Sequence, residues 1–179
     1  MYYGICLLSV VPCRKEASNT SEMVTQLLFG EHYSVTEQTE EWVKITIAYD
    51  KYECWINKKQ HTKISEATFK LLELQSPFVS TELMQLITNK TSGLNFPVPI
   101  GSTLPGLLNN ECKVEQNIFS FQGQSANSSF KKEAKDIIAT AQLQGKPAPL
   151  LIDEDMLKLM KPGAVVIDLA ASSGGNVFG

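Results

Sequence analysis

The chain has 179 residues, enough for one ordinary domain or two small ones. Hydrophobic residues make up 43% of it, so a core can form and wholesale disorder is disfavoured. The formal net charge is −3 and no basic run is longer than a pair, so we expect neither a nucleic-acid nor a membrane partner.

The N-terminal segment MYYGICLLSVV is apolar but short, and it lacks the basic start of a secretory signal. We interpret residues 1–10 as a strand that completes the fold that follows. No stretch reaches the roughly 20 apolar residues of a membrane-spanning helix, and a cytoplasmic location is expected.

Residues 11–61 contain segments in which apolar and polar residues alternate, divided by turn signals, as is typical of a small β-barrel. Residues 14–21 form a polar turn, and strands are expected at residues 22–29, 32–38, 42–48 and 52–57. Strands spaced about ten residues apart and divided by turn signals indicate a small sandwich or barrel.

The same stretch, VPCRKEASNTSEMVTQLLFGEHYSVTEQTEEWVKI followed by YECWI, resembles a bacterial SH3-like domain. The matching positions are Arg14, Gly30-Glu31, Trp42 and Trp55-Ile56, while Cys54 and Ala17 replace the family's usual glycine and frequent proline. The resemblance is strongest to the targeting domain in front of NlpC-type cysteine peptidases, which cleave cell-wall peptides. It implies an SH3-like barrel over residues 1–64.

A linker helix is expected over residues 65–76, with Ser65 as its N-cap. Residues 77–122 predict a second β-rich unit, which we expect to be SH3-like because the family often carries two such domains. Within it the prolines confine residues 96–100 to an edge or a loop, and residues 101–110 are rich in turn signals. Strands are expected at residues 112–114 and 117–121.

Residues 122–129 read as a polar linker, and a helix is expected over residues 130–143. In NlpC-type enzymes such a helix opens the catalytic domain, and an Asp-Cys-Ser-Gly motif would follow about 20 residues later. That motif is absent from the sequence. Residues 123–144 are therefore interpreted as a linker and the first helix of a peptidase domain truncated before its catalytic motif.

Residues 145–179 follow a different pattern. Residues 164–169 form a continuous apolar run, typical of a strand buried in a parallel sheet. The motifs GKPAP, MKPG, DLA and GGN resemble the nucleotide-binding domain of the NAD(P) transhydrogenase alpha subunit and, less closely, alanine dehydrogenase. We infer a junction near residues 143–145.

The remnant cofactor loop of this segment contains Asp168, Gly174 and Gly175. A GxGxxG motif is absent, and no helix follows the two glycines to receive a pyrophosphate. We expect no bound cofactor.

Catalysis by a cysteine peptidase needs a thiolate, a histidine base and a group that orients the base. The four cysteines form no CxxC pair, and buried reduced thiols are their simpler interpretation. His32 and His61 are interpreted as surface residues. We assign no catalytic and no metal-binding residue, and we do not expect the chain to cleave peptides alone.

A binding module needs only the barrel and an exposed aromatic groove. Tyr49, Tyr52 and Trp55 are the candidates for contacting a cell-wall peptide, with ordinary core or edge packing as the alternative.

The sequence thus predicts a mainly β protein, with one or two SH3-like barrels, a helix and a short α/β C-terminal segment. The favoured function is the recognition part of a peptidoglycan peptide hydrolase that lacks catalytic residues, with a cell-wall peptide or the missing catalytic domain as partner. Two alternatives stay open. The chain is a fragment of a transhydrogenase-type nucleotide-binding domain, or it is a chimera with no selected function.

Overall fold

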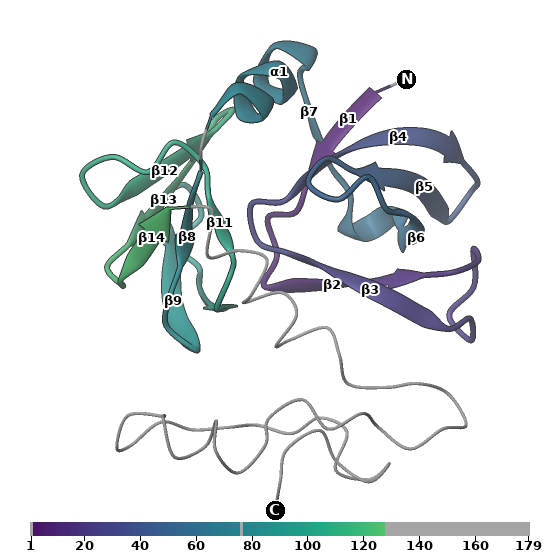
Figure 1. Ribbon diagram of the computed structural model, residues 1–179, viewed down its shortest axis with the longest axis horizontal. Helices are drawn as coiled ribbons and strands as arrows, with labels where there is room; N and C mark the ends of the chain where they lie inside the picture. The colour runs from purple at the N-terminus through teal and green to yellow at the C-terminus, as the bar shows by residue number, and fades with distance from the viewer. Residues whose placement is uncertain (1, 76, 128–179) are drawn as a thin grey trace, which may run out of the picture. The chain divides into compact units, whose positions relative to one another are not determined.

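The computed structural model describes residues 2–75 and 77–127 (Figure 1). The chain divides into two compact units, Met1–Lys132 and Glu133–Gly179, and the described residues belong to the first. The expected helix over 130–143, the strand over 164–169, the junction near 143–145 and the remnant loop lie outside them.

The N-terminal half of the described chain is a seven-stranded antiparallel sheet in the order β3-β2-β6-β5-β4-β1-β7 (Figure 1). Its strands are β1 (Tyr2–Ile5), β2 (Val10–Arg14), β3 (Met23–Leu28), β4 (His32–Gln38), β5 (Trp42–Ile47), β6 (Glu53–Asn57) and β7 (Thr62–Ile64). The four strands expected between residues 22 and 57 are confirmed, because alternating apolar residues give each strand one face for the core. Residues 1–10 are not one strand, since β1 ends at Ile5 and β2 starts at Val10.

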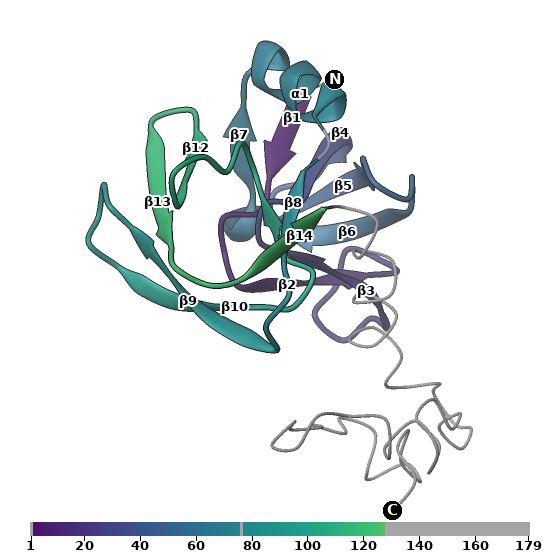
Figure 2. The same cartoon turned by 60° about the vertical axis from the view of Figure 1, so that its left-hand side comes forward.

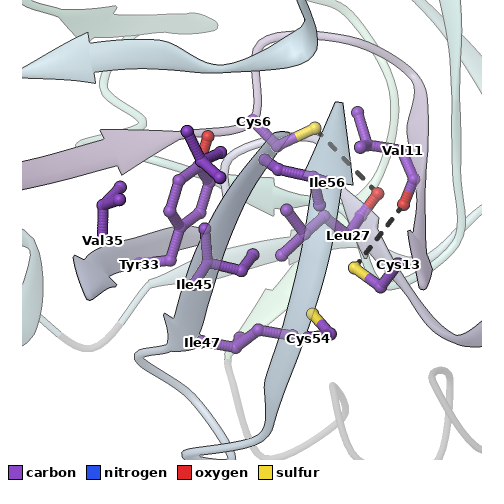
Figure 3. Close-up of a cluster of buried hydrophobic side chains, with 11 residues drawn as sticks. Cys6, Val11, Cys13, Leu27, Tyr33, Val35, Ile45, Ile47, Cys54 and Ile56 are labelled. Atoms are coloured by element: carbon purple, nitrogen blue, oxygen red, sulfur yellow. Dashed lines mark hydrogen bonds between the residues drawn. The ribbon is translucent and has the colours of Figure 1, made fainter. Parts of the chain in front are cut away.

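The core of this barrel is made of inward-facing aliphatic side chains together with three of the cysteines (Figure 3). Cys6, Cys13 and Cys54 are each at most 1% exposed. The Cys6 and Cys13 thiols lie 4.0 and 3.9 Å from the carbonyl oxygens of Leu27 and Val11, which suits weak S–H donors. The expectation of buried, reduced thiols is confirmed for all four cysteines.

A short 3₁₀ helix, η1 (Lys58–Gln60), and β7 lead into helix α1 (Glu66–Leu74). The Ser65 side chain accepts a hydrogen bond from the Thr68 N–H at 3.1 Å, so Ser65 caps α1 as expected. Phe69 fixes the helix on the barrel, because its ring stacks on Tyr3 at 4.2 Å and meets His32 edge-on at 5.2 Å.

The second β-rich region contains two small antiparallel sheets, ordered β10-β9-β13-β12 and β11-β8-β14 (Figure 2). Their strands are β8 (Phe78–Ser80), β9 (Met84–Asn89), β10 (Asn95–Pro99), β11 (Thr103–Leu104), β12 (Glu111–Val114), β13 (Asn117–Phe121) and β14 (Ser125–Asn127). The proline-containing β10 is an edge strand, as its composition predicts.

Two short strands lie where the sequence indicates turns or linker. β11 falls within residues 101–110, and β14 falls within residues 122–129. Both pair with β8, Thr103 opposite Val79 and Ala126 opposite the same residue. A strand of two or three residues is too short to show a recognisable alternation of apolar and polar residues. These two strands are therefore defined only by their pairing with β8.

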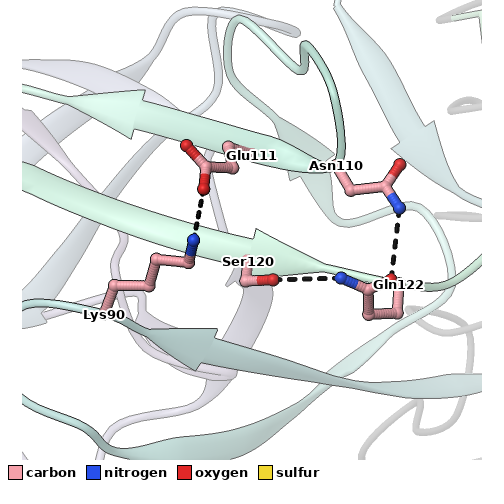
Figure 4. Close-up of polar contacts among 5 residues, drawn as sticks. All are labelled: Lys90, Asn110, Glu111, Ser120 and Gln122. Atoms are coloured by element: carbon pink, nitrogen blue, oxygen red, sulfur yellow. Dashed lines mark hydrogen bonds and ion pairs between the residues drawn. The ribbon is translucent and has the colours of Figure 1, made fainter.

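Polar contacts fasten the outer face of the four-stranded sheet (Figure 4). Lys90, which follows β9, forms an ion pair with Glu111 at the start of β12. Gln122 accepts a hydrogen bond from the Asn110 amide at 3.2 Å and donates one to the Ser120 hydroxyl at 3.2 Å. These contacts are exposed, so each contributes little to the free energy of folding, on the order of 1 kcal/mol or less.

Phe29 joins the core of the second β-rich region although it directly follows β3 of the barrel. Its ring meets Phe119 edge-on at 5.0 Å and Phe96 at 5.9 Å, and it is fully buried with Ile87 and Val98. A barrel residue thus completes the neighbouring core, so the two β-rich regions share apolar packing.

Candidate functional site

A cavity of about 330 Å³ lies where the barrel, α1 and the second β-rich region meet, and we name it the junction cavity. Its lining includes Glu31, His32, Tyr49, Lys51, Leu72 and Glu73. Ala48 and Pro77 add apolar surface, and Thr103 adds a polar contribution from β11. The lining therefore combines apolar walls with a few charged groups, as ligand sites commonly do.

Glu31 is placed by the tight turn between β3 and β4. Its Oε2 accepts a hydrogen bond from the Leu28 N–H at 2.8 Å, and its carbonyl accepts one from the Cys6 N–H at 2.8 Å. The preceding Gly30 has a φ of 78°, a left-handed conformation that favours glycine. Glu31 is only 2% exposed and lines the junction cavity, so the turn places a largely buried carboxyl group beside the cavity.

Tyr49 and Lys51 reach the cavity from the loop between β5 and β6. The loop is closed by backbone hydrogen bonds from Lys51 N–H to the Ile47 carbonyl at 2.9 Å and from Ile47 N–H to the Tyr52 carbonyl at 3.0 Å. Lys51 Nζ lies 3.4 Å from Glu73 Oε1 on α1. This exposed ion pair connects the loop to the helix across the cavity and is worth little in stability.

The three predicted aromatic residues differ in whether they line the junction cavity. Tyr49 is 46% exposed and lines the junction cavity, whereas Tyr52 is 45% exposed and does not line it. Trp55 is half-buried on β6, on the face opposite the core residues Cys54 and Ile56. Tyr49 is the one of the three that contributes to the junction cavity.

Sequence reasoning missed Glu31 and His32 as cavity residues. The sequence indicates a turn at the Gly30-Glu31 pair, and that turn is what places the carboxyl group. A charged residue directly after a turn glycine and directly before a strand is the available signal, but its burial depends on the neighbouring β-rich region.

The interpretation of both histidines as surface residues is wrong. His32 and His61 are half-buried, and each packs against aromatic rings. His61 Nδ1 lies 3.1 Å from the Tyr33 hydroxyl, and a Cβ on Gly4 would come within 2.6 Å of the His61 ring. Burial, followed by the nearby Lys63, lowers the pKa of His61, so the neutral ring is favoured.

The Cys112 thiol is a poor nucleophile. Burial raises the pKa of the Cys112 thiol to about 12, so the thiolate that attacks substrates is scarce near neutral pH. Within residues 2–75 and 77–127, no group of three or more His, Cys, Asp or Glu residues could hold a metal ion. In the same residues no helix combines the length and apolarity needed to cross a membrane.

Comparison with known proteins gives two family matches. The family described as "Bacterial dipeptidyl-peptidase Sh3 domain" matches residues 13–60, and the family described as "Alanine dehydrogenase/PNT, C-terminal domain" matches residues 59–178. The second match begins well before residue 145, where the sequence motifs place the start of the resemblance. The section of it that the structure describes is α1 and antiparallel strands.

A solved structure of an NlpC/P60 family protein from Bacillus cereus is similar to this chain, with a TM-score of 0.52 and 15% identity. The likeness covers 70% of this chain and 57% of that one, and at this identity it shows the fold alone. It confirms the mainly β, SH3-like fold class and the expected resemblance to NlpC-type proteins.

Curated relatives of this chain include transhydrogenase subunits and alanine dehydrogenases. The NAD(P) transhydrogenase subunit alpha of Haemophilus influenzae is 45% identical over 64 residues, which is 36% of this chain and 12% of that protein. The same subunit of Cereibacter sphaeroides is 52% identical over 40 residues, or 22% and 8%. Alanine dehydrogenase of Bacillus subtilis is 44% identical over 45 residues, or 25% and 12%.

The chain therefore spans no more than 12% of the length of these relatives. The longer family match, over residues 59–178, covers more than half of the chain. The chain belongs to the alanine dehydrogenase/PNT C-terminal domain family, and its residues 13–60 are similar to the bacterial dipeptidyl-peptidase SH3 domain.

Proposed function

We propose that residues 2–127 form a peptide-recognition module of a cell-wall peptidase, and that the junction cavity receives the free amino end of a short peptide. The observation that carries this proposal is the lining of the cavity, where a buried carboxyl group lies beside an exposed tyrosine and a leucine. The SH3 domain match and the fold of the NlpC/P60 neighbour support a peptidase-associated role.

The charges of the cavity favour a cationic group. Glu31 and Glu73 contribute two carboxylates, whereas Lys51 contributes one ammonium group that is already paired with Glu73. The lining thus carries a net negative charge, contributed partly by the largely buried Glu31. An α-ammonium group is attracted there more strongly than at the open surface, because screening is weaker.

The walls of the cavity suit the first side chain of a peptide. Tyr49 and Leu72 line the cavity from different elements, the β5–β6 loop and α1. A rigid aromatic ring together with an aliphatic side chain can enclose a small apolar group with little loss of conformational entropy. In this proposal the module selects the peptide end, and a separate peptidase domain supplies cleavage.

Calorimetric titration of the full chain with the tripeptide Ala-Glu-Lys tests the proposal, with the N-acetylated tripeptide as the matched ligand control. We expect binding of the free tripeptide only. Tyr49→Ala and Glu31→Gln should each weaken binding by about tenfold, the effect of losing about 1.4 kcal/mol.

Tyr52→Ala is the matched variant, because Tyr52 has nearly the same exposure as Tyr49 but does not line the cavity. It should bind like the original chain. An equal loss in Tyr49→Ala and Tyr52→Ala would place the ligand on a wider aromatic surface instead. Equal binding of the acetylated tripeptide would contradict the proposal.

A second candidate function is favoured by the 45% and 52% identities of the matched stretches to NAD(P) transhydrogenase alpha subunits. This function is a contribution to a dinucleotide site that the rest of a larger domain completes. Titration of NADH fluorescence with the chain tests it. Unchanged fluorescence is the result expected if the chain does not bind NADH by itself. Saturable binding of NADH would support the dinucleotide-site function over the peptide-recognition function.

A further inference from the structure

A second cavity of about 330 Å³ lies on the barrel, away from the lining of the junction cavity, and we name it the anion cavity. It is formed by the end of β2, the β2–β3 loop, the start of β5, the end of β6 and η1. Its lining includes Arg14, Asn19, Trp42, Asn57, Lys59 and Gln60. The two cavities share no lining residue.

Trp42 forms an apolar floor of the anion cavity. It starts β5, and alternation along that strand directs it away from the core-facing Val43 and Ile45. It is only 6% exposed, so most of its ring packs against neighbouring residues and only a small part of it reaches the cavity. The exposed part of the indole adds a small apolar contact for the methylene groups of a bound side chain.

The charges that line this cavity are both positive. Arg14 and Lys59 contribute them, and no aspartate or glutamate lines the cavity. In the described stretches of the chain neither residue forms a salt bridge. This local excess of positive charge is unusual in a chain whose net charge is −3, and it favours an anionic ligand.

The Arg14 and Asn57 side chains are held in place before any ligand binds. Arg14 Nη1 donates to the Ser21 carbonyl at 3.0 Å, and the Glu16 N–H donates to the Ser21 hydroxyl at 3.0 Å, which braces the β2–β3 loop. The Asn57 side-chain oxygen accepts the Lys59 N–H at 3.0 Å. Its amide N–H₂ remains as a donor, and fixed donors reduce the entropy lost on binding.

We propose that the anion cavity binds a side-chain carboxylate of an acidic peptide. The guanidinium edge of Arg14 that does not contact Ser21 can donate two parallel hydrogen bonds to a carboxylate, and Lys59 adds a second charge. Trp55 lies opposite Arg14 in the β2–β6 pairing and shares the outer face of the sheet. The aromatic surface therefore continues past the cavity, as suits a peptide more than a free inorganic anion.

The test uses the full chain labelled with ¹⁵N, because its two tryptophans give only two indole N–H signals. Trp55→Phe assigns the Trp42 signal. The ligand is the capped peptide N-acetyl-Ala-Glu-Glu-amide, and the control ligand is N-acetyl-Ala-Gln-Gln-amide. We expect the Trp42 signal to move in a saturable way with the acidic peptide alone.

Lys59→Gln should weaken this binding by about fivefold, the loss expected for one charged contact at a partly exposed site. Arg14→Gln should weaken the binding further. This substitution also removes the hydrogen bond to Ser21 and can disturb the β2–β3 loop, so Lys59→Gln is the variant on which the test depends. Lys113→Gln is the matched control, since Lys113 is exposed on β12 and forms no salt bridge in the described residues.

Equal shifts with the glutamine peptide, or unchanged affinity in Lys59→Gln, would overturn the proposal. Displacement of the peptide by equimolar inorganic phosphate would overturn its assignment to a peptide. The acetyl cap removes the free amine on which the junction cavity depends, so this result is independent of the proposed function.

Discussion

Gly30 lies directly against the backbone carbonyl of Thr103, so the turn after β3 touches β11 with no side chain between them. The Thr103 N–H also donates to the Phe29 carbonyl at 2.8 Å. A Cβ at position 30 would overlap the Thr103 carbonyl oxygen, and the φ of 78° disfavours any L side chain. The glycine therefore allows the barrel and the second β-rich region to meet, and their meeting forms the junction cavity.

Gly30→Ala should destabilise the protein by about 3 kcal/mol, because backbone strain and the overlap with Thr103 add together. Gly93→Ala separates the two causes, since Gly93 has a similar φ of 76° and open space around its Cβ position. It should cost only about 1 kcal/mol. Chemical denaturation of both variants measures the difference, and equal losses would show that the contact with Thr103 does not matter.

Glu115 connects the β12–β13 turn to the start of α1. Its Oε1 accepts the Ser65 N–H at 2.7 Å, and this hydrogen bond, followed by one with the Thr68 side chain, lowers the pKa of Glu115. A lowered carboxyl pKa contributes stability above the unfolded value of about 4.5, and this stability is lost as the pH falls further.

Glu115→Gln should therefore lower the free energy of unfolding at pH 7 by about 0.5–1 kcal/mol, a small value because the site is exposed. The difference from the original chain should shrink below pH 4. Denaturation at both pH values checks this, and a difference that grows in acid would refute the role given to the charge.

His61 should make the protein less stable in mild acid. Burial lowers its pKa in the folded state, so the unfolded state binds the proton more readily. The contribution of His61 is complete above the unfolded value of about 6.5 and is lost as the pH falls towards the lower folded pKa.

We expect Tm to fall between pH 7.5 and pH 5.5 and the fall to be smaller in His61→Gln. Calorimetric scans across this range measure it. Most carboxyl groups titrate below the range and do not obscure the effect. An identical pH slope in the variant would show that His61 does not titrate differently on unfolding.

Local pattern predicts most of the barrel. The sequence places β4 within the bounds His32–Gln38 that the structure shows, and it identifies Ser65 as the cap of α1. These features depend on neighbours in sequence, namely alternation along one strand and a side chain that reaches the N–H three residues on. β11 and β14 depend on a distant partner, β8, and no local signal marks them.

The candidate site is predictable only in part. The exposed Tyr49 is predictable because aromatic residues in a loop are a recognisable binding signal. The positions of Glu31 and Phe29 involve the second β-rich region. Glu31 lines the cavity together with Thr103 of that region, and Phe29 belongs to its core. Tyr52 and Trp55 stay predictions as peptide contacts, and Trp55 pairs with Arg14 across β2 and β6.

Photo-crosslinking tests the proposed recognition role most directly. The probe is a tripeptide with a free amino end and a photoreactive aliphatic first residue, irradiated with the full chain and mapped by mass spectrometry. Labels at residues 31–32, 48–51 and 72–75 are predicted, and excess Ala-Glu-Lys should abolish them. Labels confined to residues 145–179, or labels that the unmodified tripeptide does not compete away, would contradict peptide recognition in the junction cavity.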